Sequence, residues 1–281
     1  MLPPPPDTHE QVVVTTAGPI ATLWLNRPAK RNALTHAMWQ GIADACEALL
    51  ERHELRVLVV RGVGDHFCAG ADIGERGTVD AGAYLGATRA AEAGLHDFPK
   101  PTIAFVTGSC VGGGAEIAIA CDLRFADATA RFGITPARLG IVYPSFAIER
   151  AVRLLGPSAT KHLLYSAELI DTERALRIGL VDEVHEPGAA LERLDAFTTS
   201  LATERSSLTQ QASKQLVDAV VLHGAIPAAL SQRWADEVKA SSDQVEGAAA
   251  FAERRPPRFT WDRPAVPDAH DSPTRPPDHA P

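Results

Sequence analysis

The sequence has no excess of positive charge and no long apolar run. Its formal net charge is −8 over 281 residues, with 27 lysines and arginines against 35 acidic residues. This balance argues against nucleic acid or an anionic membrane surface as the main partner. No apolar run approaches the roughly 18 residues that a membrane-spanning helix requires. We therefore expect neither a nucleic-acid-binding protein nor a membrane protein.

Cysteine is scarce as well. The four cysteines have neither the spacing of a zinc site nor the density of a disulfide scaffold. Their apolar or small neighbours favour buried thiols in a reducing compartment. The first six residues include four prolines, and they lack the basic region and apolar stretch of a signal peptide. These absences predict a soluble, cytoplasmic protein without a metal site; the cysteines are Cys46, Cys68, Cys110 and Cys121.

The bulk composition is that of a globular protein, with 45% apolar and 22% charged residues. The chain is long enough to bury a large core. Prolines gather at both ends, which predicts a flexible tail over 1–10 and a Pro-rich, disordered tail over 256–281. Between the tails we expect an α/β core over 11–190 and a helical part over 191–255. No internal repeat is visible.

Hydrophobic periodicity predicts the order of the secondary structure. Segments 11–16 and 20–25 are typical of two strands in a hairpin. Segment 35–53 has helical spacing, with Thr35 as its N-cap. The apolar run 57–60 is typical of a buried parallel strand. The repeated strand–helix–strand order predicts an α/β fold with right-handed crossovers. Further strands are expected at 102–106 and 123–125, and further helices at 79–96, 147–155, 159–166, 172–178, 191–204, 207–222 and 228–240.

A glycine-rich turn that leads into an apolar helix carries the strongest chemical signal. It has the sequence Gly112-Gly113-Gly114-Ala115-Glu116 and is followed by Ile117-Ala118-Ile119-Ala120. Glycine lets the backbone approach a ligand closely, and free N–H groups at a helix start bind developing negative charge. A carboxylate one turn into the helix lies beside that anion site, where it can transfer protons. We therefore predict that Glu116 is a catalytic acid/base.

Two other clusters follow predicted strands or lie between them. Small residues in segment 67–73, after the strand at 57–60, leave room for a ligand at the carboxyl end of that strand. Two neighbouring strand exits with exposed N–H groups can form a two-donor oxyanion hole. Loop 26–34 is basic in an acidic chain, which makes it a candidate phosphate site. Each cluster alone is also explained as a tight loop or a solvated surface, but their co-occurrence favours a common site.

The order of these clusters identifies a family. The chain has Asn-Arg-Pro-x-x-Arg-Asn-Ala-Leu at 26–34, Phe-Cys-Ala-Gly-Ala-Asp-Ile at 67–73 and Gly-x-x-x-Gly-Gly-Gly-x-Glu at 108–116. This order resembles the crotonase (enoyl-CoA hydratase/isomerase) superfamily, over about residues 11–260. The resemblance implies a crotonase-type spiral of ββα units with a helical C-terminal trimerisation region, and assembly into homotrimers or hexamers. It also implies an acyl-CoA thioester as ligand, with coenzyme A as part of the substrate and no separate cofactor.

The resemblance also implies roles for individual residues. The backbone N–H groups of Ala69 and Gly113 would form an oxyanion hole for the thioester oxygen, and Glu116 would be the acid/base. The residues that fall at the family's CoA-binding positions are Arg27, Lys30, Arg31 and Ala33 in the basic loop, and Ala71, Asp72 and Ile73 in the second cluster.

One position departs from the family. Hydratases of the superfamily use a second glutamate twenty residues after the first, and this chain has Pro136 there. Proline has no proton to transfer, and a missing general acid/base typically costs about 10²–10⁴-fold in rate, so the two-glutamate hydration mechanism is not expected. The Thr135-Pro136 pair and Tyr143 are similar to methylmalonyl-CoA decarboxylase-like members, in which Tyr143 would orient a carboxylate or donate a proton.

Three functions stay open on the sequence alone. The first is an enoyl-CoA hydratase/isomerase-type lyase or isomerase with a single glutamate acid/base. The second is a methylmalonyl-type decarboxylase with Tyr143 as a second catalytic residue, although Ala71 stands where a polar side chain is expected and Tyr143 also fits a packing role. The third is a non-catalytic acyl-CoA-binding protein. Glu116 in an apolar helix start favours an enzyme, because an idle buried carboxylate costs stability.

Overall fold

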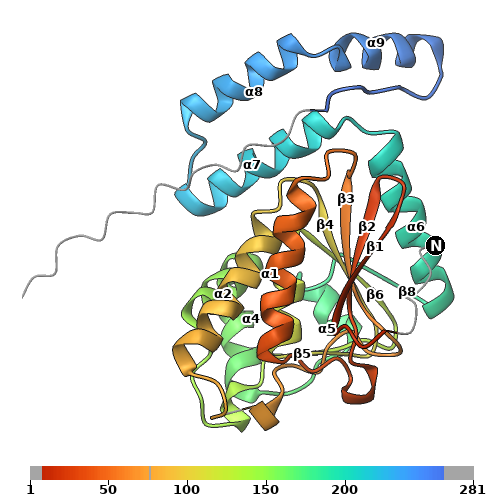
Figure 1. Cartoon of the computed structure of the whole chain (residues 1–281). Helices are drawn as coiled ribbons and strands as arrows, with labels where there is room; N and C mark the ends of the chain where they lie inside the picture. Colours follow the sequence, from red (N-terminus) through yellow and green to blue (C-terminus); the bar gives the residue numbers. More distant parts are fainter. Residues whose placement is uncertain (1–7, 76, 263–281) are drawn as a thin grey trace, which may run out of the picture.

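A six-stranded sheet forms the centre of the protein (Figure 1). The computed structural model describes residues 8–75 and 77–262, so most of both predicted tails lies outside the described residues. In the strand order β1-β2-β3-β4-β6-β8, β1 and β2 are antiparallel and all later neighbours are parallel. A second sheet pairs β5 with β7. The strands are β1 (Val12–Ala17), β2 (Ile20–Leu25), β3 (Val57–Gly62), β4 (Thr102–Val106), β5 (Ser109–Val111), β6 (Leu123–Asp127), β7 (Arg131–Gly133) and β8 (Glu183–His185).

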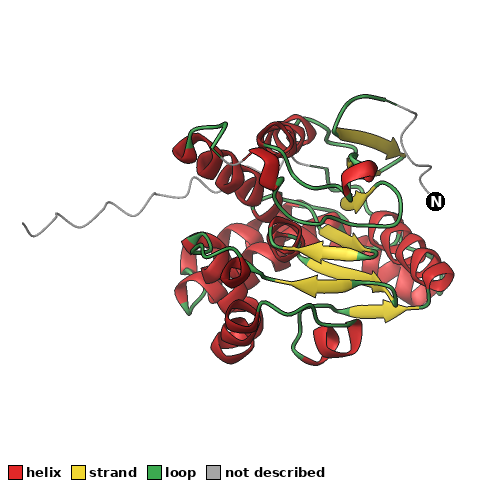
Figure 2. Cartoon of the chain, turned by 90° about the horizontal axis from the view of Figure 1, so that it is seen from below, coloured by secondary structure: helices red, strands yellow, loops and turns green. Residues whose placement is uncertain are grey.

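Helices cover both faces of the large sheet. Helices α1, α2 and α4 lie on one face and α6 lies on the other (Figure 1), and the view from below in Figure 2 shows the strands enclosed between helices. The helices are α1 (His36–Leu50), α2 (Ala81–His96), α3 (Gly113–Ala120), α4 (Ser145–Ser166), α5 (Thr172–Arg177), α6 (Pro187–Thr203), α7 (Ser207–His223), α8 (Ala228–Ala240) and α9 (Asp243–Glu253), with 3₁₀ turns η1 (Pro28–Lys30), η2 (Ile73–Glu75) and η3 (Pro136–Arg138).

The two faces of the sheet bury different cores because side chains alternate along each strand. In β3, Leu58 and Val60 belong to the larger core, which α1, α2, α3 and α4 cover. Val57 and Val59 of the same strand belong to the smaller core under α6. Strand β4 alternates in the same way. Both strands are therefore buried on two sides, as their continuous apolar runs predict.

Helices α7, α8 and α9 extend away from the sheet. Figure 1 shows α8 and α9 beyond α7, on its far side from the strands. A small separate core joins α7 to α8. The ring of Trp261 lies 6.3 Å from that of Trp234 on α8, and the Trp261 N–H donates to the Asp243 carboxylate at 3.3 Å. The sequence assigns residues 256–262 to the C-terminal tail. In the structure this segment contacts the helical region through Trp261.

The predicted α/β architecture is confirmed by the sheet and its helices. The expected hairpin is present as β1 and β2. The Thr35 hydroxyl caps α1 by accepting a hydrogen bond from the Met38 N–H at 3.1 Å.

Other boundaries differ from the prediction for identifiable reasons. The two helices expected at 147–155 and 159–166 are joined in α4, where Gly156 breaks the helical conformation with a φ of 75° before Pro157. Helix α6 begins earlier than expected, at Pro187, because proline is well tolerated at a first helical position. Strands β5, β7 and β8 were not predicted, since each has three residues and is too short to show a periodicity.

Asn32 anchors the basic loop to the segment after β3. Its side chain is fully buried, and its Nδ2 donates to the carbonyl oxygens of Val63 at 3.0 Å and His66 at 2.6 Å. Its Oδ1 accepts from the Arg27 N–H at 2.8 Å. Both Arg31 and Asn32 have left-handed φ values, 49° and 56°, a conformation that asparagine tolerates better than most residues. The path of the loop is therefore set by one buried amide.

We expect Asn32→Ala to lower the free energy of unfolding by about 2–4 kcal/mol, because it leaves buried carbonyl groups unpaired and places alanine in a left-handed conformation. Urea denaturation measures the change. Lys30→Ala in the same loop is the control, since Lys30 is exposed and its replacement should change stability by less than about 0.5 kcal/mol. Equal stability of the two variants would rule out the anchoring role.

Candidate active site

Glu116 lies on the first turn of α3, where the sequence predicts a catalytic carboxyl group. Gly112 precedes the helix with a φ of 52°, which glycine adopts without strain. The Glu116 N–H donates to the Gly112 carbonyl oxygen at 3.0 Å. Every residue of α3 is buried, so no side of this helix faces solvent. The helix dipole favours an ionised carboxylate at this end, whereas burial opposes it.

Glycines let α3 approach the loop that follows β3. A Cβ atom on Gly114 would lie 2.5 Å from the Cys68 carbonyl oxygen, and one on Gly113 would lie 2.9 Å from the Trp39 ring. Gly70 has a φ of 106°, and a Cβ on it would lie 3.8 Å from the Gly113 nitrogen. The first two contacts leave no room for a side chain. The start of α3 and the Cys68 loop therefore meet backbone to backbone.

Two backbone N–H groups at this meeting point are free to bind a ligand. Within the described residues, neither the Ala71 nor the Gly113 N–H has a hydrogen-bond acceptor. The Ala69 N–H, which the resemblance assigns to the oxyanion hole, donates to the Arg31 carbonyl oxygen at 2.9 Å. A donor that is already engaged must give up its bond before it can bind a ligand oxygen. The geometry therefore favours Ala71 over Ala69 as the partner of Gly113.

The protonation of Glu116 is set chiefly by burial. Glu116 is 6% exposed, and burial raises the pKa of Glu116 from an ordinary value of 4.5 to about 7, with the nearby Tyr143 hydroxyl acting in the opposite direction. A pKa near neutrality populates both the acid and the base at physiological pH. That is the property a group needs if it is to accept a proton and return it.

Tyr143, which precedes α4, is brought to the same helix start. It is buried, and its hydroxyl donates to the Gly112 carbonyl oxygen at 3.0 Å. Burial, followed by the charge of Glu116, raises the pKa of Tyr143 well above its usual range, so the phenol keeps its proton. Pro136 is buried in η3 and offers no acid at the position of the family's second glutamate. The structure thus brings Tyr143 to the start of α3, next to Glu116.

The residues predicted to bind coenzyme A divide into two groups. Arg27 is held in place, because it donates to the Asp72 carboxylate and to the Ala33 carbonyl oxygen, each at 2.7 Å. It ties the basic loop to the second cluster. Lys30 and Arg31 are exposed, and neither forms a salt bridge within the described residues, so both are available to a phosphate. The remaining predicted contacts, Ala71 and Ile73, are exposed beside Asp72.

Glu92 on α2 is a buried carboxyl group that the sequence analysis did not identify. It is 1% exposed, and burial together with the charge of Glu116 raises the pKa of Glu92 to about 8. A signal for it was present in the sequence, because helical spacing places Glu92 on one buried face with Thr88, Ala91 and Leu95. A glutamate on such a face requires a partner or a function.

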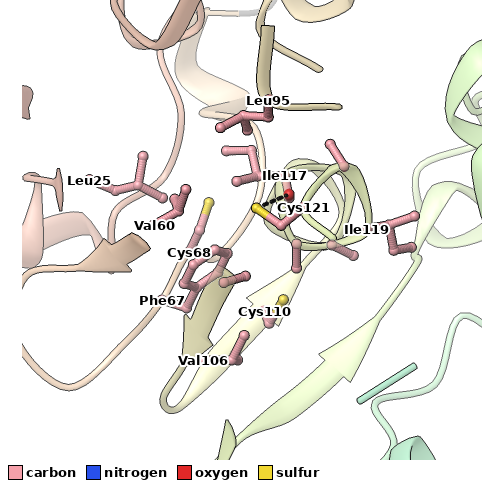
Figure 3. Packing of buried hydrophobic residues seen from close by; sticks show 14 of the residues in the cluster. Leu25, Val60, Phe67, Cys68, Leu95, Val106, Cys110, Ile117, Ile119 and Cys121 are labelled. Carbon is pink, nitrogen blue, oxygen red and sulfur yellow. Dashed lines mark hydrogen bonds between the residues drawn. The ribbon is translucent and has the colours of Figure 1, made fainter. Parts of the chain in front are cut away.

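The cysteines near α3 have packing roles, as expected for buried thiols. Figure 3 shows Cys68, Cys110 and Cys121 among apolar side chains, with the Cys121 thiol donating to the Ile117 carbonyl oxygen at 3.4 Å. Burial raises the pKa of Cys68 to about 12, so it is not a thiolate nucleophile at neutral pH. In the part of the chain that the structure describes, no group of histidine, cysteine and acidic side chains is arranged to hold a metal ion.

Comparison with known proteins identifies the family. The family model for enoyl-CoA hydratase/isomerase matches residues 15–262. A putative enoyl-CoA hydratase from Thermus thermophilus is 34% identical, over 88% of this chain and 100% of the relative. The 2,3-dehydroadipyl-CoA hydratase of Escherichia coli is 34% identical, over 89% of this chain and 98% of the relative. The crystal structure of an enoyl-CoA hydratase/carnithine racemase from Magnetospirillum magneticum is 30% identical, with a TM-score of 0.86 over 90% of this chain and 96% of that chain.

The fold is that of a crotonase-type protein, and the predicted fold class is confirmed by this structural likeness. The chain belongs to the enoyl-CoA hydratase/isomerase family and is an acyl-CoA enzyme of that family. Among the described residues, no helix is both long enough and apolar enough to cross a membrane.

We expect Glu116→Gln to stabilise the folded protein more at pH 8 than at pH 5. The folded state keeps the Glu116 proton up to about pH 7, whereas an ordinary glutamate releases it near 4.5. The contribution of this group to stability is therefore complete below pH 4.5 and falls as the pH rises through that window, by about 1.4 kcal/mol per pH unit at most. Thermal unfolding of both proteins at the two pH values measures the effect. A difference independent of pH would contradict the raised pKa.

Proposed function

We propose that the protein catalyses proton transfer at an acyl-CoA thioester in an enoyl-CoA hydratase/isomerase-type reaction, with Glu116 as its acid/base. The observation that carries this proposal is the place of Glu116, a buried carboxyl group with a pKa of about 7 beside the unpaired N–H of Gly113. Proton transfer next to a thioester carbonyl creates an oxyanion. A neutral-range carboxyl group beside an anion-binding N–H suits both needs.

In the proposed mechanism, the thioester oxygen accepts hydrogen bonds from the N–H groups of Ala71 and Gly113. When Glu116 removes a proton from a carbon of the acyl chain, the electron pair moves to this oxygen and forms an enolate. In an isomerisation the same carboxyl group returns the proton to another carbon. In a hydration it takes a proton from the water whose oxygen bonds to the β-carbon, and it then returns that proton to the α-carbon of the resulting enolate. Loss of one oxyanion donor typically costs about 10²–10³-fold in rate, which explains the importance of the glycine contacts.

The names of the relatives support hydration or isomerisation as the first candidate. They include the Escherichia coli 2,3-dehydroadipyl-CoA hydratase and the mouse methylglutaconyl-CoA hydratase, 30% identical over 85% of this chain and 79% of the relative. Pro136 sets this chain apart from a two-glutamate mechanism, because it carries no proton. We therefore assign the proton transfer at the acyl chain to Glu116 alone.

A decarboxylase for a methylmalonyl-type acyl-CoA is the second candidate. Tyr143 favours it, because its hydroxyl keeps its proton and lies at the start of α3. Decarboxylation breaks a carbon–carbon bond, releases CO₂ and leaves the electron pair as a thioester enolate. The reaction then needs an oxyanion hole and a proton donor at carbon, and Tyr143 would provide that donor. Non-catalytic binding of an acyl-CoA is a third candidate, which the raised pKa of Glu116 disfavours.

We further propose that the active form is a homotrimer or a hexamer. The supporting feature is the helical region α7–α9, which extends away from the sheet (Figure 1) and corresponds to the trimerisation region that the family resemblance implies. The proposed chemistry needs no cofactor other than the coenzyme A of the substrate. A cytoplasmic location agrees with the four buried, unpaired cysteines.

A panel of acyl-CoAs distinguishes these reactions. The purified protein is incubated with crotonyl-, 3-enoyl-, methylmalonyl- and aromatic acyl-CoA, and the products are identified by mass spectrometry. We expect turnover of an enoyl-CoA, reduced by about 10²–10⁴-fold in Glu116→Gln. The control is Glu149→Gln, which changes a carboxylate that is 62% exposed on α4. Turnover of methylmalonyl-CoA alone would replace the first candidate with the decarboxylase, and binding without turnover would replace it with the binding protein.

Lys30→Ala combined with Arg31→Ala should raise KM and leave kcat nearly unchanged. Both side chains are exposed and are expected to contact phosphates far from the reacting carbons, so they contribute equally to substrate and transition-state binding. Steady-state kinetics with the substrate found in the panel measures the change. Lys239→Ala, at a side chain 73% exposed on α8, is the matched control. A double variant with unchanged KM would remove the basic loop from the CoA site.

A further inference from the structure

A second buried carboxyl group, that of Glu92, lies on α2, which packs against the helix of Glu116. Helix α2 packs against α3, and this contact brings the two glutamates close enough for the charge of one to act on the other. The Glu92 Oε2 accepts from the Arg150 Nε at 3.2 Å. Its Oε1 is buried and has no hydrogen-bond partner among the described residues. Glu92 is therefore held by one cation through one oxygen only.

This arrangement favours a neutral Glu92. A buried carboxylate is stable only when both of its oxygens are well paired, and an unpaired oxygen costs less on a neutral carboxyl group than on an anion. A neighbouring negative charge disfavours ionisation further. Two carboxyl groups in one apolar region cannot both ionise readily, so they lose their protons in two steps. The unpaired, buried Oε1 indicates that Glu92 is the member that stays protonated, while the cation of Arg150 acts in the opposite direction.

The groups around Glu92 come from each element packed against it. Glu116 faces it from α3, Arg150 faces it from α4, and the Tyr143 phenol lies within the influence of both carboxyl groups. From α1, Cys46 packs against α2, where its Cβ would lie 3.1 Å from a Cβ on Gly94. Burial raises the pKa of this thiol to about 12, so it is neutral. Arg150 is thus the one cation among these groups.

We propose that Glu92 is a positioning residue for Glu116. It keeps its proton even though Arg150 contacts its Oε2, and Glu116 is therefore the first of the two carboxyl groups to ionise. This inference rests on the proposed function of Glu116. In the reaction, Glu116 alone accepts a proton from the substrate or water and returns it, while Glu92 keeps its own. No proton passes between Glu92 and the substrate. When Glu92 ionises at high pH, a second negative charge faces the developing enolate and opposes its formation.

The protonation order is tested directly by ¹³C NMR titration of the glutamate side chains in the full-length protein without substrate. In the unmodified protein we expect two carboxyl groups to titrate far above the ordinary range, at about 7 for Glu116 and about 8 for Glu92. Glu116→Gln should lower the remaining pKa of Glu92, because the neighbouring charge is gone. Arg150→Met should raise the pKa of Glu92, because the cation is gone. Arg150 also lines a groove of about 460 Å³ next to α7, which leaves space for the methionine.

Glu92→Gln should remove the higher titration and leave that of Glu116 near 7. Glu149→Gln, on the exposed side of α4, is the control and should change neither titration. If Glu92→Gln does not fold, Glu116→Gln and Arg150→Met still decide the question. The proposal is overturned if Glu92 titrates in the ordinary glutamate range, or if its pKa is the same in Glu116→Gln as in the unmodified protein. These readouts need no turnover, so they stay separate from a failure of the proposed function.

The pH dependence of kcat/KM gives the functional readout with the substrate found in the panel. We expect kcat/KM to decline above about pH 8 in the unmodified protein, as Glu92 ionises. The decline should be absent in Glu92→Gln and should move to higher pH in Arg150→Met. A merely structural role would lower kcat and leave the position of the decline unchanged. That result would overturn the positioning role, even if the two carboxyl groups prove to be coupled.

Discussion

The burial of an ionisable group at Glu116 is the constraint on which the rest of the site depends. A carboxyl group in apolar surroundings needs nearby groups that can respond to its charge, and α3 itself provides only its helix start. The Tyr143 hydroxyl comes from the segment before α4, and Glu92, which responds to the charge of Glu116, comes from α2 and is itself held by Arg150 of α4. These elements are far apart in the sequence and meet only in the folded core. The proton affinity of the site is therefore a property of the whole α/β packing and cannot be assigned to the glycine-rich motif alone.

The loops around this core contain two kinds of residue, those that fix the path of the loop and those whose charges can contact a ligand. Asn32 and Arg27 are largely withdrawn from solvent and fix the paths of the basic loop and the Asp72 segment. Lys30 and Arg31 stand on the resulting framework with their charges free of ion pairs among the described residues. An acidic chain can thus present a small basic surface at one place, which is what recognition of a polyanionic ligand by a protein of net charge −8 requires.

Much of this architecture could be predicted because the sequence carries local signals for it. Apolar runs marked β3 and β4, the glycine run marked the start of α3, and Thr35 marked the start of α1. The hydrogen bond of the Ala69 N–H could not be predicted, because its acceptor is the Arg31 carbonyl oxygen, on a distant loop whose approach no local pattern reveals.

Glu92 was missed for a related reason. Its helix could be predicted, but its neighbours could not, because Glu116 and Arg150 reach it only through the packing of α3 and α4. Properties that depend on pairs of distant residues are the ones that sequence patterns leave undetermined.

The glycine contacts at the start of α3 also limit how this site can evolve. Gly113 and Gly114 touch Trp39 and Cys68 so closely that any side chain would separate the helix from its loop. Mutational drift is therefore blocked where the enolate would be held. It is much freer in the exposed stretch before α4, where Val142 is 90% exposed. Substitutions in that exposed stretch can therefore accumulate without disturbing the packing of α3.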